Sequence, residues 1–473
     1  MTERTNIRPI AGAVAGWSEH GHGNLSQRLA TALRRQIEAG LIVSGSRLPP
    51  ERQLAADLAV SRSTVTAALD ILRAEQLVVS RQGHGTVVVS DEGSGIAANR
   101  IADHLVVGSG GIDLAVGNPA DASHLPAVSI DVADLIASGA GPGFQPLGLP
   151  SMRAALAGMH SSRGLHTSAD EIQVTAGAHH AIAVLLGAYL VPGDVIAAEV
   201  PGYPGLFDVT DGLGVRIAPV ELDRGGMRPE SLDAALTEHR PRFAYVQAGV
   251  HNPTGRVTSG ARLRALAAIF DRHETTVIED TTLSELVFAG RPVVDLASLC
   301  RRAPVVTVGS WSKVFWGGLR VGWIRAPEAV IERTLHRRLS ADLGAAIPSQ
   351  LFCLRLMPHL DEIAEQRRRF LENNVGRAAG LLADEVPEWR FEMPSGASVL
   401  WVDTGLDDAA PLEHFAHRHG VHVASGSIAA PGPDVDGHLR LCVDRPWELV
   451  DAGLRRLGAA WRELSRRPAR VAG

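Results

Sequence analysis

The sequence predicts two modules of different fold class: a mainly helical N-terminal module that ends in a small hairpin, and a larger α/β module with a largely parallel sheet. Within residues 25–89, apolar side chains first recur at helical spacing and then form two short β-branched runs around a glycine-rich turn. From residue 113 onward, β-branched runs alternate with amphipathic stretches, as in parallel α/β sheets. The second module also contains the chain's single lysine, Lys313.

Length and composition exclude several classes of protein. A chain of 473 residues exceeds one ordinary core, so two or three domains are expected. No apolar run approaches about 18 residues without a charge, Gly or Pro, and the N-terminus lacks the apolar segment of a signal peptide. We therefore expect no membrane span and a cytoplasmic location. The three cysteines are scattered singly, which fits neither a disulfide framework nor a zinc site, and we interpret all three as buried small hydrophobic residues: Cys300, Cys353 and Cys442.

Charge is distributed unevenly. The formal net charge is −6, which argues against a protein that is basic throughout. The first ninety residues are locally basic, however, which leaves room for a small nucleic-acid-binding module. The arginines concerned are Arg28, Arg34, Arg35, Arg47, Arg52, Arg62, Arg73 and Arg81.

The N-terminal module is predicted to hold three helices and a hairpin. The first helix spans the apolar repeat from Leu25 to Ile37 and stops at Gly40. The second follows the prolines at 49 and 50, with Pro50 at its first position and Leu54, Leu58 and Val60 on its apolar face. Ser61 caps a third helix that turns Val65, Leu69 and Leu72 inward. Residues 77–79 and 86–89 then read as two short strands around residues 82–85.

A helix, a short turn and a second helix with a polar, arginine-bearing start are typical of a helix-turn-helix, which places its recognition helix in the major groove of DNA. A packing module without a DNA role is the alternative, although it would not need hydroxyls and guanidinium groups on an exposed helix start. The stretch resembles GntR-type winged helix-turn-helix domains in Leu-Pro-Pro-Glu-Arg, Val-Ser-Arg-x-Thr-Val and the Gly-x-Gly-Thr wing.

That resemblance implies DNA contacts at particular positions. Arg62 is the candidate for a bidentate bond with guanine, and Arg52 the candidate for a phosphate contact. Thr66 departs from the family pattern, which often places arginine there. The implied DNA-binding set is Arg52, Ser61, Arg62, Ser63 and Thr64 on the helices, with Gly83, His84 and Gly85 at the wing tip.

Residues 91–111 carry Gly and Ser at both ends, and we interpret them as a linker between a DNA-binding domain at 1–90 and a second domain at 112–473.

In the second domain, residues 172–175 predict a strand, 176–178 a turn of small residues, and 179–190 a helix. The free N–H groups at a helix start can hold a phosphate, although this signal is weak when it stands alone.

Lys313 is the residue whose type argues most directly for chemistry. Every other basic side chain, apart from histidine, is arginine, which is effectively never deprotonated, whereas a buried amine can lose its proton and attack a carbonyl group. A lysine that merely survived an arginine bias is the alternative. Residues 305–308 predict a buried strand that ends just before Lys313, and the neighbouring Ser310, Ser312 and Arg320 suit an anionic phosphate beside a Schiff base.

Ser-x-Ser-Lys followed by Gly-Leu-Arg-x-Gly resembles the pyridoxal phosphate lysine motif of fold-type I aminotransferases. The resemblance implies that fold, with a large parallel-sheet domain and a smaller C-terminal α+β domain, and an internal aldimine of pyridoxal 5'-phosphate on Lys313. It implies a phosphate seat at the turn, Tyr203 over the pyridine ring, Asn252 and Thr282 near its phenolic oxygen, Asp280 beside its nitrogen, and Arg440 for an effector carboxylate. The implied cofactor-binding set is Gly177, Ala178, His179, Tyr203, Asn252, Asp280, Thr282, Ser310, Ser312, Lys313 and Arg320, and no metal is expected.

Two of these positions have plain structural alternatives: Tyr203 could fill a loop and Asp280 could cap a strand end. The chain also departs from the aminotransferase pattern. Thr282 stands where the family has an aromatic hydroxyl, Phe144 where a partner subunit's tyrosine usually reaches the phosphate, and His179 with His180 where glutamine is common. These changes leave the main cofactor contacts in place and make efficient turnover less secure.

A GntR-like head fused to an aminotransferase-like domain is the layout of MocR-type regulators, and the resemblance covers nearly the whole chain. It implies a transcriptional regulator that binds a double-stranded DNA operator and senses pyridoxal phosphate or an amino compound, as a homodimer for which a head-to-tail arrangement is one option. An active aminotransferase that carries a DNA-binding head is the first alternative. A repressor whose large domain only dimerises, without cofactor, is the second.

Overall fold

The computed structural model divides into two compact units, and the larger consists of Ala98–Ala409 and Ala416–Ala460. The domain boundaries expected at 90 and 111 stay predictions, because most of the intervening residues lie outside the described part. Among the described residues, no helix combines the length and the apolar character needed to cross a membrane. The structure describes residues 17, 24–38, 42, 48–74, 77–81, 85–88, 100–101, 111–288, 294–430, 432 and 435–466.

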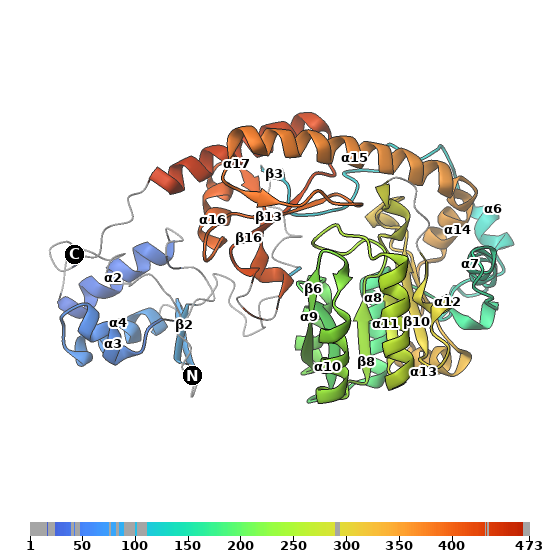
Figure 1. Ribbon diagram of the computed structural model, residues 1–473, viewed down its shortest axis with the longest axis horizontal. Helices are drawn as coiled ribbons and strands as arrows, with labels where there is room; N and C mark the ends of the chain where they lie inside the picture. Colours follow the sequence, from blue (N-terminus) through green and yellow to red (C-terminus); the bar gives the residue numbers. More distant parts are fainter. Residues whose placement is uncertain are drawn as a thin grey trace. The chain divides into compact units, whose positions relative to one another are not determined.

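The described residues of the N-terminal unit form three helices and a two-stranded antiparallel hairpin, as predicted (Figure 1). Leu29, Leu69 and Leu72 are fully buried between the helices, which gives this unit a core of its own. The elements are α2 (Leu25–Glu38), α3 (Glu51–Asp57), α4 (Arg62–Ala74), β1 (Val78–Arg81) and β2 (Gly85–Val88).

Helix α3 differs from its prediction at both ends. Pro50 is the N-cap residue rather than the first helical residue, and its ψ of 140° keeps it outside the helix. The helix ends at Asp57, because Ala59 adopts a left-handed backbone with φ of 52°. Leu58 and Val60 therefore pack against the core from the turn instead of from a helical face.

The larger unit is built on a mixed sheet of eight strands in the order β4-β11-β10-β9-β8-β5-β6-β7. Its five central strands, from β10 to β6, run parallel, and antiparallel strands flank them on both sides, so the predicted largely parallel sheet is confirmed. The strands are β4 (Ile172–Thr175), β5 (Val195–Val200), β6 (Arg216–Asp223), β7 (Gly226–Met227), β8 (Phe243–Val246), β9 (Thr276–Asp280), β10 (Val305–Ser310) and β11 (Gly322–Arg325).

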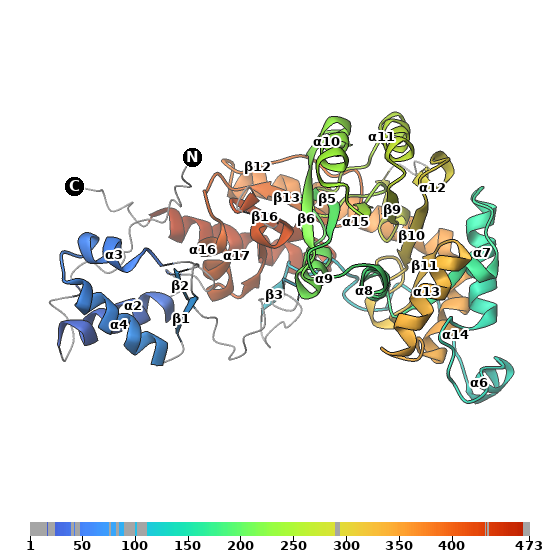
Figure 2. The same cartoon turned by 90° about the horizontal axis from the view of Figure 1, so that it is seen from below.

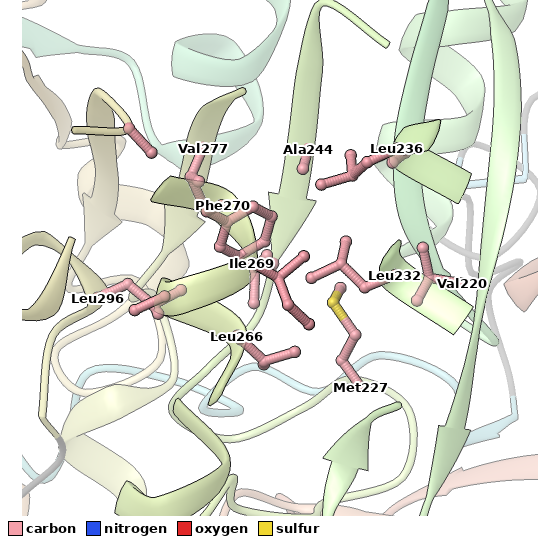
Figure 3. Packing of buried hydrophobic residues seen from close by; sticks show 14 of the residues in the cluster. Val220, Met227, Leu232, Leu236, Ala244, Leu266, Ile269, Phe270, Val277 and Leu296 are labelled. Carbon is pink, nitrogen blue, oxygen red and sulfur yellow. The ribbon is translucent and has the colours of Figure 1, made fainter. Parts of the chain in front are cut away.

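Alternation along the strands gives this sheet two buried faces. In β8, Phe243 and Tyr245 pack into one apolar cluster, whereas Ala244 and Val246 pack into the other. The first cluster is covered by α8 (Ala178–Tyr189), α9 (Pro204–Leu213) and α13 (Glu328–Leu339). The second is covered by α10 (Pro229–His239), α11 (Gly260–His273) and α12 (Leu296–Leu299), and Figure 3 shows its packing around Phe270.

A second, smaller sheet has the strand order β12-β13-β16-β15 and is antiparallel throughout. The long helix α15 (Leu360–Glu385) runs along it (Figures 1 and 2), and Asn374 Nδ2 of this helix donates to Val443 O at 2.9 Å. The remaining bounds are β3 (Ile112–Asp113), α6 (Val132–Ala137), α7 (Pro150–Ser162), α14 (Ile347–Leu356), β12 (Arg390–Phe391), β13 (Val399–Asp403), α16 (Ala410–Arg418), β14 (Val421–His422), β15 (Ala424–Ser425), β16 (His438–Cys442) and α17 (Trp447–Arg466).

The cysteine prediction holds for two of the three residues. Cys353 and Cys442 are buried, but Cys300 is only half-buried, because it follows the last residue of α12 rather than lying within the core.

Replacing Phe270 by alanine tests the core of the large sheet. Because the ring is fully buried among α10, α11 and the strands, Phe270→Ala should lower the free energy of unfolding by about 3–5 kcal/mol. Chemical denaturation measures this loss. Arg264→Ala, an exposed substitution on the same helix, is the control and should leave the denaturation midpoint nearly unchanged. Equal stability of the two variants would contradict this packing.

Candidate functional site

The carboxyl ends of neighbouring parallel strands bring the central residues of the site to one edge of the sheet. Val308 of β10 pairs with Asp280 of β9, which is that strand's last residue. Lys313 follows three residues after β10 ends at Ser310. Ligands in open α/β sheets bind at such an edge. Lys313 and Asp280 therefore reach the same region although 33 positions separate them in the sequence.

Lys313 is held by the segment that follows β3. Its Nζ donates to Asn118 Oδ1 at 2.6 Å and to Gly117 O at 2.9 Å. Desolvation, with the nearby cation of Arg440, lowers the pKa of the Lys313 amine to about 8. Roughly a tenth of such amines are neutral at pH 7, so the group can act as a nucleophile under ordinary conditions.

Asp280 is buried and receives two hydrogen bonds. Tyr245 donates its hydroxyl to Asp280 Oδ2 at 2.5 Å, and the backbone N–H of Thr282 donates to Oδ1 at 2.9 Å. Burial, together with the neighbouring Asp280, raises the pKa of Tyr245 well above its usual value, so its hydroxyl remains a donor. The Thr282 hydroxyl is buried without a protein partner among the described residues, which leaves it available to a ligand.

Arg440, on β16 of the small sheet, contacts Asn252, which lies in the segment after β8 of the large sheet. Arg440 Nε donates to Asn252 Oδ1 at 3.0 Å, and its Nη1 donates to Ala115 O at 2.6 Å. Gly117 lies against this group, since an added Cβ there would stand 3.3 Å from Arg440 Nη2. The structure thus brings the predicted carboxylate-binding arginine next to the predicted ring-oxygen residue.

The predicted phosphate turn adopts a suitable backbone. Gly177 is the N-cap of α8 with φ of 95°, and the helix begins one residue earlier than predicted, at Ala178. Arg320 Nη2 donates to Ala176 O at 2.6 Å, so a guanidinium stands beside the helix start. Arg320 itself has a left-handed backbone, φ 51°, which a non-glycine residue adopts only where its surroundings enforce it. A positive side chain and free N–H groups together suit an anion.

The remaining predicted positions surround these groups. The Tyr203 hydroxyl lies 3.4 Å from His179 Nδ1, and desolvation lowers the pKa of His179. Ser310 donates its hydroxyl to Val321 O at 2.8 Å and accepts from the N–H of Ser312 at 3.2 Å, which fixes the turn before Lys313. His180 is a structural residue, because its Nδ1 accepts from the N–H of Ala176 at 3.0 Å.

The predicted DNA-binding residues of the helices lie in α3, at Arg52, and at the start of α4, at Arg62, Ser63 and Thr64, with Ser61 just before it. The Ser61 hydroxyl accepts from the N–H of Thr64 at 3.1 Å, as predicted for the cap, and lies within 2.8 Å of both Ser63 Oγ and Thr64 Oγ1. The Arg62 side chain is 72% exposed, and Arg52 is also exposed. Gly85 begins β2, whereas Gly83 and His84 lie outside the described residues.

Sequence reasoning missed three residues that contact the key positions of the two units. Asn118 contacts Lys313, Tyr245 contacts Asp280, and Glu51 accepts from the Thr66 hydroxyl at 2.9 Å while its carboxylate lies 3.4 Å from Arg62 Nε. A Gly-Asn-Pro turn at 117–119 was the available signal for Asn118. Tyr245 lies inside an ordinary buried strand and carried no signal of its own.

Comparisons with known proteins match both parts of the chain. The family described as aminotransferase class I and II matches residues 109–457. The chain belongs to the class I and II aminotransferase family. Bacterial regulatory proteins of the gntR family match residues 25–88, so the predicted fusion of a GntR head with an aminotransferase-like domain, the MocR-type layout, is confirmed.

The chain is similar to proteins named as transcriptional regulators and to a solved aminotransferase. The uncharacterized HTH-type transcriptional regulator YisV of Bacillus subtilis is 27% identical over 418 residues, which cover 80% of this chain and 85% of YisV. The probable rhizopine catabolism regulatory protein MocR of Rhizobium meliloti is 29% identical over 381 residues, with 73% and 76% covered. The crystal structure of LysN, the α-aminoadipate aminotransferase of Thermus thermophilus complexed with N-(5'-phosphopyridoxyl)-L-leucine, has a TM-score of 0.70 and 25% identity over 78% of this chain and 96% of that one.

The lowered pKa of Lys313 can be measured directly, because an amine reagent can label only this side chain and the N-terminus. The labelling rate of Lys313 should rise with pH through a midpoint near about 8, since only the neutral amine reacts. Peptide mass spectrometry separates the two labels, and the N-terminal amine is the internal reference. Arg440→Gln should shift the midpoint to higher pH, because it removes a neighbouring cation. A midpoint near the ordinary value of 10.5 would contradict the assigned environment.

Proposed function

We propose that this protein is a cytoplasmic transcriptional regulator that binds an operator through its N-terminal unit and binds pyridoxal 5'-phosphate and an amino compound in its aminotransferase-like unit. The observation that carries the proposal is Lys313: a single lysine, with its pKa lowered to about 8, at the same sheet edge as a buried aspartate. The GntR-family match and the regulator names of relatives support the DNA-binding part.

The residues of the site fit this cofactor. The start of α8 and Arg320 would hold its phosphate, with Ser310 and Ser312 shaping the turn beside it. Asp280 would stand beside the ring nitrogen and keep it protonated, and Tyr203 would cover the ring. The orphan hydroxyl of Thr282 and the amide of Asn252 are available to the ring oxygen. Pyridoxal phosphate, when bound, supplies an aldehyde and a ring that accepts electron density.

Arg440 and its neighbours would form the binding site for the carboxylate group of an effector. Arg440 presents a guanidinium whose fork matches a carboxylate, with Asn252 and the backbone of Gly117 beside it. Asn118 holds the Lys313 amine through its Oδ1. An effector that binds one arrangement of the two units more tightly than another would thereby change operator affinity, which requires unequal affinity for the two arrangements.

Trapping the cofactor tests the proposal. Incubation with pyridoxal phosphate, borohydride reduction and peptide mass spectrometry should locate the cofactor mass on Lys313. Lys313→Arg keeps the positive charge but should give no adduct on the 313 peptide. An adduct confined to the N-terminus, or no adduct, would favour the alternative of a large unit that only dimerises.

A catalytically active aminotransferase is the second candidate, because Arg440 and Asp280 both act on the charge of Lys313 and solved aminotransferases share the fold. Steady-state assays with a panel of amino donors distinguish the two. A keto acid that accumulates over many turnovers would indicate the enzyme, whereas at most one equivalent per chain fits a sensor.

The DNA-binding prediction concerns Arg62. Because its guanidinium is largely exposed at the start of α4, Arg62→Ala should weaken operator binding by about 1–3 kcal/mol. Fluorescence anisotropy with operator DNA measures the change. Arg264→Ala, which removes an exposed arginine from the large unit, should leave affinity unchanged. Equal affinities for the Arg62 and Arg264 variants would remove the assignment.

Self-association is supported by exposed apolar side chains in and after α6. Val132, Ile136 and Phe144 are 70%, 77% and 64% exposed in the single chain, more than a solvated surface usually leaves uncovered in one segment. We expect the protein to sediment as a dimer and Ile136→Glu to shift it toward the monomer. Glu365→Gln on α15 is the control for a change of charge away from α6. Asp134 of α6 is not used for this purpose, because it accepts a hydrogen bond from Arg355 within the chain. A monomeric wild type would contradict this expectation.

A further inference from the structure

A cavity of about 340 Å³ lies within the larger unit, apart from the residues grouped around Lys313. One wall comes from the large sheet and its loops, through Arg224, Thr254 and Arg256. The opposite wall comes from the small sheet, through residues of β12, β13 and β16. A cavity of this volume accommodates a small organic molecule.

The register of the small sheet shows where this cavity lies relative to Arg440, the arginine proposed to bind an effector carboxylate. Trp401 pairs with Arg440 and Asp403 pairs with His438, so these four side chains share one face of the small sheet. Arg390 pairs with Asp403 and extends the same face to β12. The cavity and Arg440 therefore occupy different positions along one continuous face.

The charges around the cavity leave one positive charge in excess. Three guanidinium groups, of Arg224, Arg256 and Arg390, stand against two carboxylates, of Glu392 and Asp403. Glu392 is engaged, since it accepts from Arg224 at 2.9 Å and from Arg256 at 2.7 Å. Among the described residues no carboxylate lies within 4.0 Å of Arg390, so this guanidinium is free to bind an anion.

Two stacked aromatic rings line the same cavity as Arg390. The rings of Trp401 and His438 are stacked with centroids 4.9 Å apart and an interplanar angle of 13°. Desolvation lowers the pKa of His438, so the imidazole is neutral at neutral pH and adds no charge. A flat aromatic surface with an unpaired guanidinium nearby favours a planar ring that carries a single anionic group.

We propose that this cavity is a second ligand site, which binds a monoanionic aromatic carboxylate with its carboxylate on Arg390 and its ring against Trp401 and His438. Because the two walls belong to different sheets, a bound ligand would hold them in the arrangement seen here. The site does not require Lys313 or its cofactor.

Three probes of nearly equal size test the chemistry. Isothermal titration of the full chain should show benzoate binding most tightly, cyclohexanecarboxylate more weakly because it cannot stack, and benzamide most weakly because it lacks the charge. Equal binding of all three, or no binding of benzoate, would overturn the proposal.

Variants locate the site. Arg390→Gln should weaken benzoate binding by about tenfold or more, because a charge-assisted bond is lost. Arg228→Gln is the matched control, since Arg228 bonds to Glu221 and does not line the cavity. Trp401→Leu should reduce the preference for benzoate over cyclohexanecarboxylate, and thermal unfolding confirms that each variant is folded. Unchanged affinity in Arg390→Gln would overturn the assignment.

The cofactor site is tested in the same assay, because a benzoate anion could also occupy Arg440. Lys313→Ala and Arg440→Gln should both retain benzoate binding. Loss of binding in Arg440→Gln with retention in Arg390→Gln would place the anion at Arg440 and refute a second site. Failure to trap pyridoxal phosphate on Lys313 would count against the proposed function and would leave this result untouched.

Discussion

The site depends on one constraint: the Lys313 amine must lie near the buried carboxylate of Asp280, and yet this carboxylate must not raise the pKa of the amine back to its ordinary value. Parallel pairing of β9 with β10 ends both strands at the same edge, which places Asp280 and the Lys313 turn together. Tyr245 and the N–H of Thr282 donate to the two carboxylate oxygens of Asp280, and the cation of Arg440 acts on the Lys313 amine. Desolvation and that cation outweigh the attraction of the acids, so the amine keeps a lowered pKa.

The segment from Asp113 to Asn118 connects this edge to the small sheet. Arg445 donates to Asp113 Oδ2 at 2.5 Å and to Asn118 O at 2.7 Å, and the buried pair of Arg367 and Asp444 fixes the loop that carries it. A buried pair of this kind is costly to break, because the remaining charge would be unpaired. Hydrogen bonds and ion pairs therefore connect Lys313 to the small sheet and to α15 through the segment from Asp113 to Asn118.

Sequence reasoning succeeded where the signal was local. The order of strands and helices, the serine cap of α4 and the turn at Gly177 follow from residue type and spacing, and the head's hydrophobic core follows from helical periodicity. It failed where partners meet only through folding. Asn118 is 195 positions from Lys313 and Tyr245 is 35 from Asp280, so no spacing rule joins either pair. The length of α3 was missed because the left-handed backbone of Ala59 is not typical of alanine.

In the N-terminal unit, Thr66 stands where the GntR pattern often has arginine, and this departure changes the contacts of the charged residues around it. Thr66 donates to Glu51 Oε2, which ties α4 to α3 and leaves Glu51 beside Arg62. An arginine at 66 would instead add a third cation to α4, which already carries Arg62 and Arg73. With threonine there, the exposed cation at the helix start is Arg62, whose 3.4 Å contact with Glu51 is a weak surface ion pair. The residues of this helix that are predicted to contact DNA therefore cluster at its first turn, where the hydroxyls of Ser61, Ser63 and Thr64 form one polar group.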